Sequence, residues 1–178
     1  MGFIDAIKTC FAKYVTFSGR APRSEYWWFF LFVILGGIVA SLIDLALFGA
    51  PEPVEGEPSS SGGPINGIFS LVTFLPLLAA GWRRMHDTGR SGKLLLLPLA
   101  VTLGLMLLML FGIMGVGMIE QAGGAEMVEG PAIALGTFGM ILILVLQIVL
   151  SILILWWLSR PSQPGTNEYG PNPQEVTQ

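Results

Sequence analysis

The segment Gly81-Trp-Arg-Arg-Met-His-Asp-Thr-Gly-Arg-Ser-Gly-Lys93 is a polar, charged interruption in the apolar middle of the chain. It holds four of the nine lysine and arginine residues and the only histidine. Apolar stretches long enough to approach the span of a bilayer flank it on both sides. The segment therefore predicts a charged loop between two membrane spans.

The composition excludes a water-soluble globular domain. Of the 178 residues, 53% are hydrophobic and only 12% are charged, about half the roughly 25% found in soluble domains. A single cysteine, Cys10, excludes an internal disulfide and a cysteine-based metal site. We therefore expect an all-α membrane protein whose apolar surface is covered by lipid.

Hydropathy predicts one membrane domain over residues 1–178. Residues 2–15 have the spacing of an amphipathic helix, which could lie in the membrane interface or pack on the protein's own cytosolic surface. A linker, four transmembrane helices and a polar cytoplasmic tail at 159–178 follow. The transmembrane helices are predicted at 26–48, 65–82, 94–119 and 132–158.

Positive charge is confined to alternate segments of this predicted topology. All nine lysines and arginines precede the first span, separate the second from the third, or follow the fourth. The other two loops carry six glutamates and no positive charge. The positive-inside rule then predicts cytoplasmic termini and a cytoplasmic cap that includes the 81–93 loop. All five tryptophans fall at predicted cytoplasmic boundaries, as interface anchors do: Trp27, Trp28, Trp82, Trp156 and Trp157.

Three of the predicted cytoplasmic segments carry distinctive motifs. They read Phe17-Ser-Gly-Arg-Ala-Pro-Arg-Ser-Glu-Tyr-Trp-Trp28, Arg84-Met-His-Asp-Thr-Gly-Arg-Ser-Gly92 and Gly165-Thr-Asn-Glu-Tyr-Gly-Pro-Asn-Pro173. With them the chain resembles the bacterial inner-membrane family called domain of unknown function 805, from about Gly2 to Pro173. Lys93 and Leu94 depart from the family pattern, which often has aromatic residues there. The resemblance implies a small multi-pass plasma-membrane protein and no established chemistry.

His86 and Asp87 could be taken for an acid–base pair, but adjacent helical residues point about 100° apart. A structural role is favoured, with Asp87 closing an Asx turn and Gly89 supplying a left-handed backbone conformation. Because the chain has no second histidine, we expect no metal site. No cofactor is expected either.

Arginine dominates the predicted cytoplasmic cap. Its planar guanidinium can bind a carboxylate or a phosphate through two hydrogen bonds. The cap acids or a lipid phosphate could be the partner, and internal pairing with incidental lipid contact is favoured. The tail is predicted to fold back so that Tyr169 lies against the 81–93 loop. The candidate anion-contacting or cap-organising residues are Arg20, Arg23, Glu25, Arg83, Arg84, His86, Asp87 and Arg90.

The sequence favours a protein without evident catalytic activity, acting in interaction or envelope maintenance at the inner membrane. Its expected partners are membrane lipids and either a second protein or another copy of itself, without nucleic acid. One alternative is a small transporter or channel subunit using Asp44 and Gln147, the conspicuous polar residues in the spans. The other is a membrane enzyme that acts on a lipid headgroup through His86 and Asp87.

Overall fold

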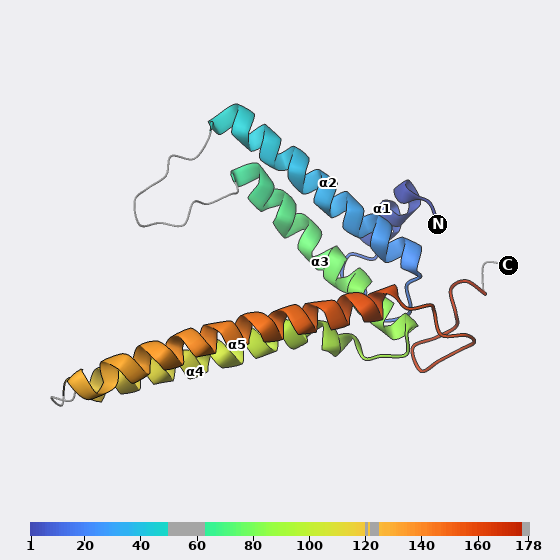
Figure 1. The fold of residues 1–178 in the computed structure, drawn as a ribbon. Helices are drawn as coiled ribbons and strands as arrows, with labels where there is room; N and C mark the ends of the chain where they lie inside the picture. Colours follow the sequence, from blue (N-terminus) through green and yellow to red (C-terminus); the bar gives the residue numbers. More distant parts are fainter. Residues whose placement is uncertain (50–62, 120, 122–124, 176–178) are drawn as a thin grey trace. The chain divides into compact units, whose positions relative to one another are not determined.

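The computed structural model describes residues 1–49, 63–119, 121 and 125–175. This described part contains helices and no strand, and its one β-type contact is an isolated bridge between Asn167 and Gly170. The α-helices are joined by loops and by one short 3-10 helix, η1 (Figure 1). Their bounds are α1 Phe3–Ala12, α2 Arg23–Phe48, α3 Pro64–Asp87, η1 Gly92–Leu96, α4 Leu97–Ile119 and α5 Ala125–Ser159.

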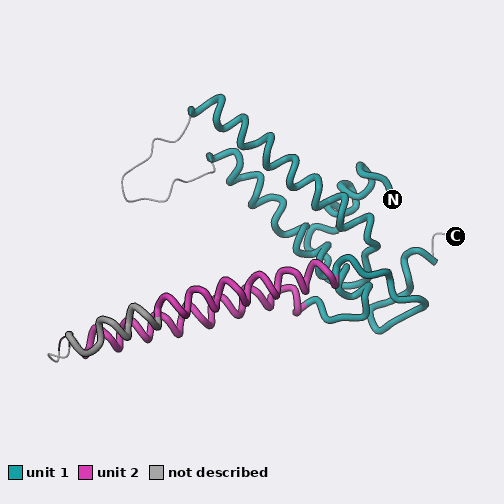
Figure 2. The backbone as a smooth tube through the Cα atoms, viewed as in Figure 1, with its two compact units in different colours: residues 1–92, 158–178 teal, residues 93–157 magenta. Residues whose placement is uncertain are grey.

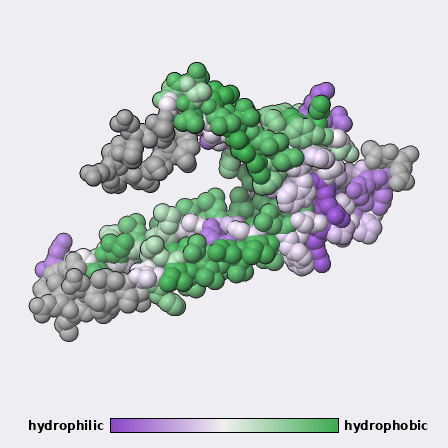
Figure 3. All heavy atoms as spheres, turned by 45° about the horizontal axis from the view of Figure 1, so that its top comes forward, coloured by the Kyte–Doolittle hydropathy of each residue, from purple (hydrophilic) through white to green (hydrophobic). Residues whose placement is uncertain are grey.

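Four helical segments in the described residues are long and apolar enough to cross a membrane. They are Arg23–Phe48, Pro64–Asp87, Gly92–Ile119 and Gly136–Ser159. Hydrophobic side chains cover the outer surface of these helices (Figure 3). Water would oppose so much exposed apolar surface, whereas a bilayer accommodates it. The predicted all-α fold with four membrane spans is confirmed.

The chain forms two compact units (Figure 2). Unit 1 comprises residues 1–92 and 158–178, and unit 2 comprises residues 93–157. Inside unit 2, the Gln147 side-chain amide in α5 donates a hydrogen bond to the Thr102 hydroxyl in α4 at 2.6 Å. Thr102 in turn donates to the carbonyl of Pro98 at 2.8 Å. The Gln147 side chain therefore joins α5 to α4 inside unit 2.

In unit 1, α2 and α3 pack against each other. Gly36 of α2 faces the ring of Phe69 in α3, and a Cβ at Gly36 would lie only 2.3 Å from that ring. The ring of Phe32, one turn earlier in α2, packs edge-on against Phe69 at a centroid distance of 5.9 Å. The missing side chain at Gly36 thus gives Phe69 the space it fills.

The start of α3 is capped by its neighbour α2. The N-cap residue Gly63 has no side chain to accept the free N–H groups of the first turn. The buried carboxylate of Asp44 accepts them instead, from Ile65 at 3.0 Å and from Asn66 at 2.8 Å. A Cβ at Gly63 would lie 2.4 Å from Asp44, so glycine is needed for this approach.

Helix α1 packs across both α2 and α3. Its inner side buries Ala6 and Cys10. The ring of Phe11 packs edge-on against Phe29 at 5.5 Å and against Phe32 at 6.0 Å. Aromatic contacts therefore fix α1 beside the first turns of α2.

Tyr14 compensates for a proline inside α3. In a regular helix the carbonyl of Val72 would accept the N–H of residue 76, but that residue is Pro76, which has none. The Tyr14 hydroxyl donates to this carbonyl at 2.7 Å. Residues just after α1 are thus tied to the middle of α3 at the one carbonyl that the proline leaves unpaired.

Candidate functional site

Buried ion pairs gather at the end of unit 1 where α3 finishes and α2 begins. We call this group the arginine cluster: Arg20, Arg83 and Arg84 with Glu25 and Asp87. All five residues are buried, and Arg84 and Asp87 have no exposed surface. Ions of this kind are costly to remove from water unless they are paired and hydrogen-bonded. Only because they are paired can these five charged side chains be buried at this end of the protein.

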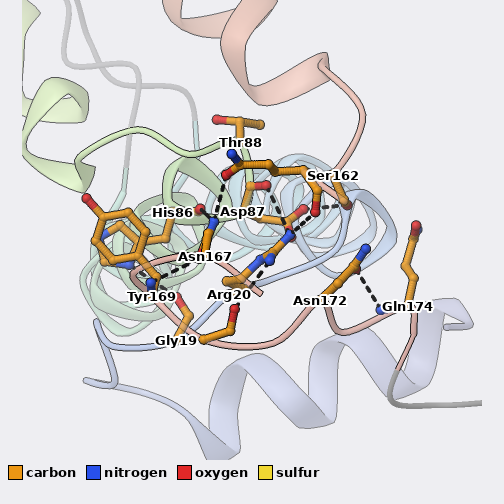
Figure 4. A network of polar contacts seen from close by, with 12 residues as sticks. Gly19, Arg20, His86, Asp87, Thr88, Ser162, Asn167, Tyr169, Asn172 and Gln174 are labelled. Carbon is orange, nitrogen blue, oxygen red and sulfur yellow. Dashed lines mark hydrogen bonds and ion pairs between the residues drawn. The ribbon is translucent and has the colours of Figure 1, made fainter. Parts of the chain in front are cut away.

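Asp87, the last residue of α3, is the central acceptor (Figure 4). One carboxylate oxygen accepts the Arg20 Nε–H at 3.0 Å. The other accepts from Arg84 and from the Ser162 hydroxyl. A carboxylate with three donors has little capacity left to act as a proton acceptor for a substrate.

Arg83 and Glu25 form the second pair, which joins α3 to the first turn of α2. The Arg83 guanidinium donates to the Glu25 carboxylate at 2.7 Å. It also donates to the carbonyls of Lys13 and Thr16 in the segment after α1. One side chain therefore holds three parts of the N-terminal half together.

The pair of arginines around Asp87 carries one more positive charge than the carboxylate can neutralise. Backbone carbonyls of the C-terminal segment surround this extra charge. Arg84 donates to Leu158 and Arg160. Arg20 reaches three further carbonyls in the tail, which belong to Gln163, Gly165 and Gly170. The carbonyls of the tail thus supply the buried guanidinium groups with hydrogen-bond acceptors in place of water.

His86 lies beside the cluster and anchors the tail through its ring. The Tyr169 ring stacks on it at 3.8 Å between centroids, with 3° between the planes (Figure 4). His86 Nδ1 lies 3.1 Å from the carbonyl of Gly19, and because a carbonyl only accepts, Nδ1 carries the proton. The Asn167 amide donates to the backbone carbonyl of His86 at 3.0 Å. The predicted return of the tail to the 81–93 loop is confirmed.

The predicted turn at the end of α3 is half right. Gly89 has a φ of +72°, the left-handed conformation expected of it. The Asx turn at Asp87 is wrong, because its carboxylate accepts from arginines and Ser162 instead. The turn is closed by the backbone, where the Gly89 N–H donates to the carbonyl of His86 at 3.0 Å. Ion pairing with Arg84 in the same helix and with the distant Arg20 thus replaces the Asx turn.

The remaining predicted residues lie outside the cluster. Arg23, at the start of α2, is exposed. Arg90 is half-buried and donates to the carbonyl of Thr88 at 3.2 Å. The tryptophans lie near the ends of α2, α3 and α5 that lead into the cluster: Trp27, Trp82 and Trp157 are half-buried, and Trp28 and Trp156 are exposed.

Sequence reasoning missed several residues that organise this site. Ser162 and Asn167 bond to the end of α3, yet a polar tail offers no periodic pattern that would mark them. Tyr14 could have been found, because a proline inside a span always leaves the carbonyl four residues earlier without its usual donor. No group of three or more His, Cys, Asp or Glu side chains suited to a metal occurs in the part of the chain that the structure describes.

Four apolar spans and a polar end built from buried ion pairs define a multi-pass integral membrane protein. Residues 14–124 match the family described as "Protein of unknown function (DUF805)", and the chain belongs to this family. The resemblance seen in its motifs is confirmed.

Two Escherichia coli K12 proteins are among the relatives. The chain is 40% identical to inner membrane protein YhaI over 99 residues, covering 56% of this chain and 75% of the relative. It is 37% identical to inner membrane protein YhaH over 99 residues, covering 56% and 76%. No solved structure matches the chain significantly. The protein is thus an integral inner-membrane protein in contact with lipid.

Proposed function

We propose that both termini and the 81–93 loop lie in the cytoplasm, so that the arginine cluster is the core of a cytoplasmic cap. The segregation of all nine lysines and arginines into these segments supports this orientation. Helix α1 then lies in the cytoplasmic interface of the bilayer, against the spans that it contacts.

The protein serves, in this proposal, as an interaction or envelope-maintenance protein without catalytic activity. The observation that carries it is the use of Asp87, which binds two buried arginines and Ser162. His86 is likewise held by Gly19 and covered by Tyr169. His86 and Asp87, which resemble catalytic groups, therefore hold the cap together. The cap in turn presents a fixed surface to anionic lipid or to a protein partner.

The two alternative functions have no specific observation in their favour. A transport path would use Asp44 and Gln147, but Asp44 caps α3 and Gln147 pairs with Thr102. A headgroup-modifying enzyme would need the His86 ring to reach its substrate, and Tyr169 stacks on one face of that ring. Asp44 and Gln147 therefore bond to other protein groups rather than lining a transport path, and the His86 ring stacks on Tyr169 rather than facing a substrate.

Orientation is tested with a reporter enzyme that is active only in the periplasm. Fused after Gln178, it should be inactive, and inserted in the acidic 50–62 loop it should be active. The opposite pattern would contradict the cytoplasmic cap. The second fusion is the control, because it shows that the chain inserts and that the reporter works.

Function is tested by extracting the full chain with its surrounding membrane and identifying bound lipids and proteins by mass spectrometry. We expect enrichment of an anionic phospholipid or of a defined protein partner. Arg84→Ala should reduce that enrichment, because it removes the side chain that joins Asp87 to the tail. A chemically altered lipid that disappears in His86→Ala would contradict the proposal and favour the enzyme.

A further inference from the structure

The arginine cluster has two parts, which differ in their balance of charge. In the first part, Arg83 pairs with the one acid Glu25, so positive and negative charges are equal. In the second part, Arg20 and Arg84 share Asp87, and neither arginine has another acidic partner among the described residues. A buried cation is normally held by a countercharge. The second part is therefore short of one negative charge.

Uncharged carbonyls of the C-terminal segment stand where a second acid would balance this charge. The carbonyls that accept from Arg20 and Arg84 are those of Leu158, Arg160, Gln163, Gly165 and Gly170. The tail has acids of its own, but Glu175 accepts from the Gly165 N–H at 3.1 Å and from the Asn172 amide at 2.9 Å instead. An anion is a stronger partner for a guanidinium than a carbonyl is. Group for group, an external anion therefore binds these two arginines more strongly than the tail carbonyls do.

The tail is held by polar contacts that allow it to leave as one piece (Figure 4). Among residues 159–175, Asn172 is the only buried one, and regions with so little buried surface open at a low cost in free energy. The tail also keeps its own turns. The Asn167 side chain accepts the Tyr169 N–H at 2.9 Å, and the Asn172 side chain accepts the Gln174 N–H at 3.0 Å. Release of the tail therefore breaks its contacts with the cluster without unfolding the spans.

We infer that Arg20 and Arg84 form a binding site for a phosphate group, and that the tail closes this site until a phosphate competes for it. Each guanidinium offers parallel N–H groups that match two phosphate oxygens. Arg23, exposed at the start of α2 and near enough to repel Arg84, adds a third cation. The phosphate is carried by a lipid headgroup or by a soluble molecule. The inference rests on the proposed function, because it names the anionic group that the cap receives and where that group binds.

The wild-type full chain, reconstituted in nanodiscs of phosphatidylcholine, is followed by amide hydrogen exchange. Inorganic phosphate in the buffer tests a soluble ligand, and phosphatidylglycerol in the nanodisc tests a lipid headgroup. We expect at least one of them to speed exchange in residues 162–175 severalfold while residues 83–90 stay protected, because the phosphate replaces the carbonyls. Potassium chloride of equal ionic strength is the control, since it only screens charge. Unchanged exchange with both phosphates, or an equal effect of the chloride, would overturn the inference.

Two variants that each remove one positive charge show whether the effect belongs to Arg20. Arg20→Gln leaves Arg84 and Asp87 as a matched pair, so the chain should fold and yet bind phosphate about tenfold more weakly, as expected on losing a hydrogen bond to a charged group. Lys8→Gln removes the same charge from an exposed residue of α1 and should bind phosphate like the wild type. Binding is measured as the phosphate concentration, or the phosphatidylglycerol fraction, that gives half of the change in exchange. Equal binding by the two variants would overturn the site.

A variant whose tail is released provides a second, independent measurement. Asn167→Ala/Tyr169→Ala removes the contacts of the tail with His86 and should bind phosphate about tenfold more tightly, because the tail no longer competes for the arginines. Native mass spectrometry counts the phosphatidylglycerol retained, and equilibrium dialysis measures inorganic phosphate. Unchanged or weaker binding would overturn the inference even if Arg20→Gln failed to fold. The proposed function would survive that result if the native-membrane extraction still enriched a lipid or a protein partner, so the two failures are distinguishable.

Discussion

Asp87 forms two of the ion pairs of the arginine cluster in unit 1. It is the only carboxylate that pairs with Arg20 and Arg84 in the described residues, and all three side chains are buried. Asp87→Asn keeps the shape but leaves two guanidinium groups without a countercharge. We expect a loss of about 3–5 kcal/mol in the free energy of unfolding.

The loss is measured from the denaturation midpoint of the purified protein in detergent, followed by tryptophan fluorescence. Glu168→Gln is the matched control, because it removes the same charge from an exposed tail residue. It should change stability by about 0.5 kcal/mol or less. If the two variants denature alike, the buried pairs contribute nothing and the account of the arginine cluster is wrong.

The reactivity of the Cys10 thiol tests whether this side of α1 is buried. Burial, reinforced by the charge of Glu25, raises the pKa of its thiol to about 12, although Arg83 and Lys13 act in the other direction. At pH 8 the reactive thiolate would be on the order of one molecule in 10⁴. A maleimide should therefore leave folded Cys10 unmodified and label it after denaturation. An added exposed thiol, Thr166→Cys, should react at once, and similar rates at both positions would refute the buried position of Cys10.

At the scale of elements, Tyr14 links the docking of α1 to the proline in α3. Tyr14→Phe removes the donor to the carbonyl of Val72 and should cost about 1–3 kcal/mol, the penalty for an unsatisfied acceptor. In a Pro76→Ala background the helix itself supplies an N–H, so the same Tyr14→Phe change should cost much less. A double-mutant cycle of unfolding free energies should give a coupling of about 1 kcal/mol or more. Additive effects would show that the hydroxyl does not replace the missing N–H.

Element positions followed from hydropathy, but the contacts that fix them did not. Four apolar runs were sufficient to predict four spans, because lipid demands such runs whatever the tertiary packing. The cap of α3 is a contact that hydropathy could not predict. Asp44 was predicted as a possible transport residue within a span, yet it caps a helix that begins some twenty residues later in the chain. Nothing in the local pattern shows that Gly63 brings the two together.

At the scale of the molecule, the arginine-rich motifs showed which residues would gather but not how they would pair. Charge segregation brought Arg20, Glu25 and Asp87 to one predicted end, and Tyr169 marked the returning tail. The carboxylate partners of Arg20 and Arg83 depend on distances between segments that lie 67 and 58 residues apart. A local Asx turn at Asp87 was wrong for the same reason: a charge from a distant segment outcompetes a neutral local hydrogen bond.

The tail should therefore behave as part of the fold rather than as an appendage. Its carbonyls surround two buried arginines, and Asn167 and Tyr169 fasten it to His86. Asn167→Ala/Tyr169→Ala should speed amide hydrogen exchange in the tail and also in residues 16–22 and 83–90, because the guanidinium groups lose acceptors when the tail leaves. Thr166→Ala, at an exposed position between the same contacts, should change exchange little. Faster exchange confined to the tail would mean that the arginine cluster is complete without it, and the carbonyls would then be incidental to the buried charge.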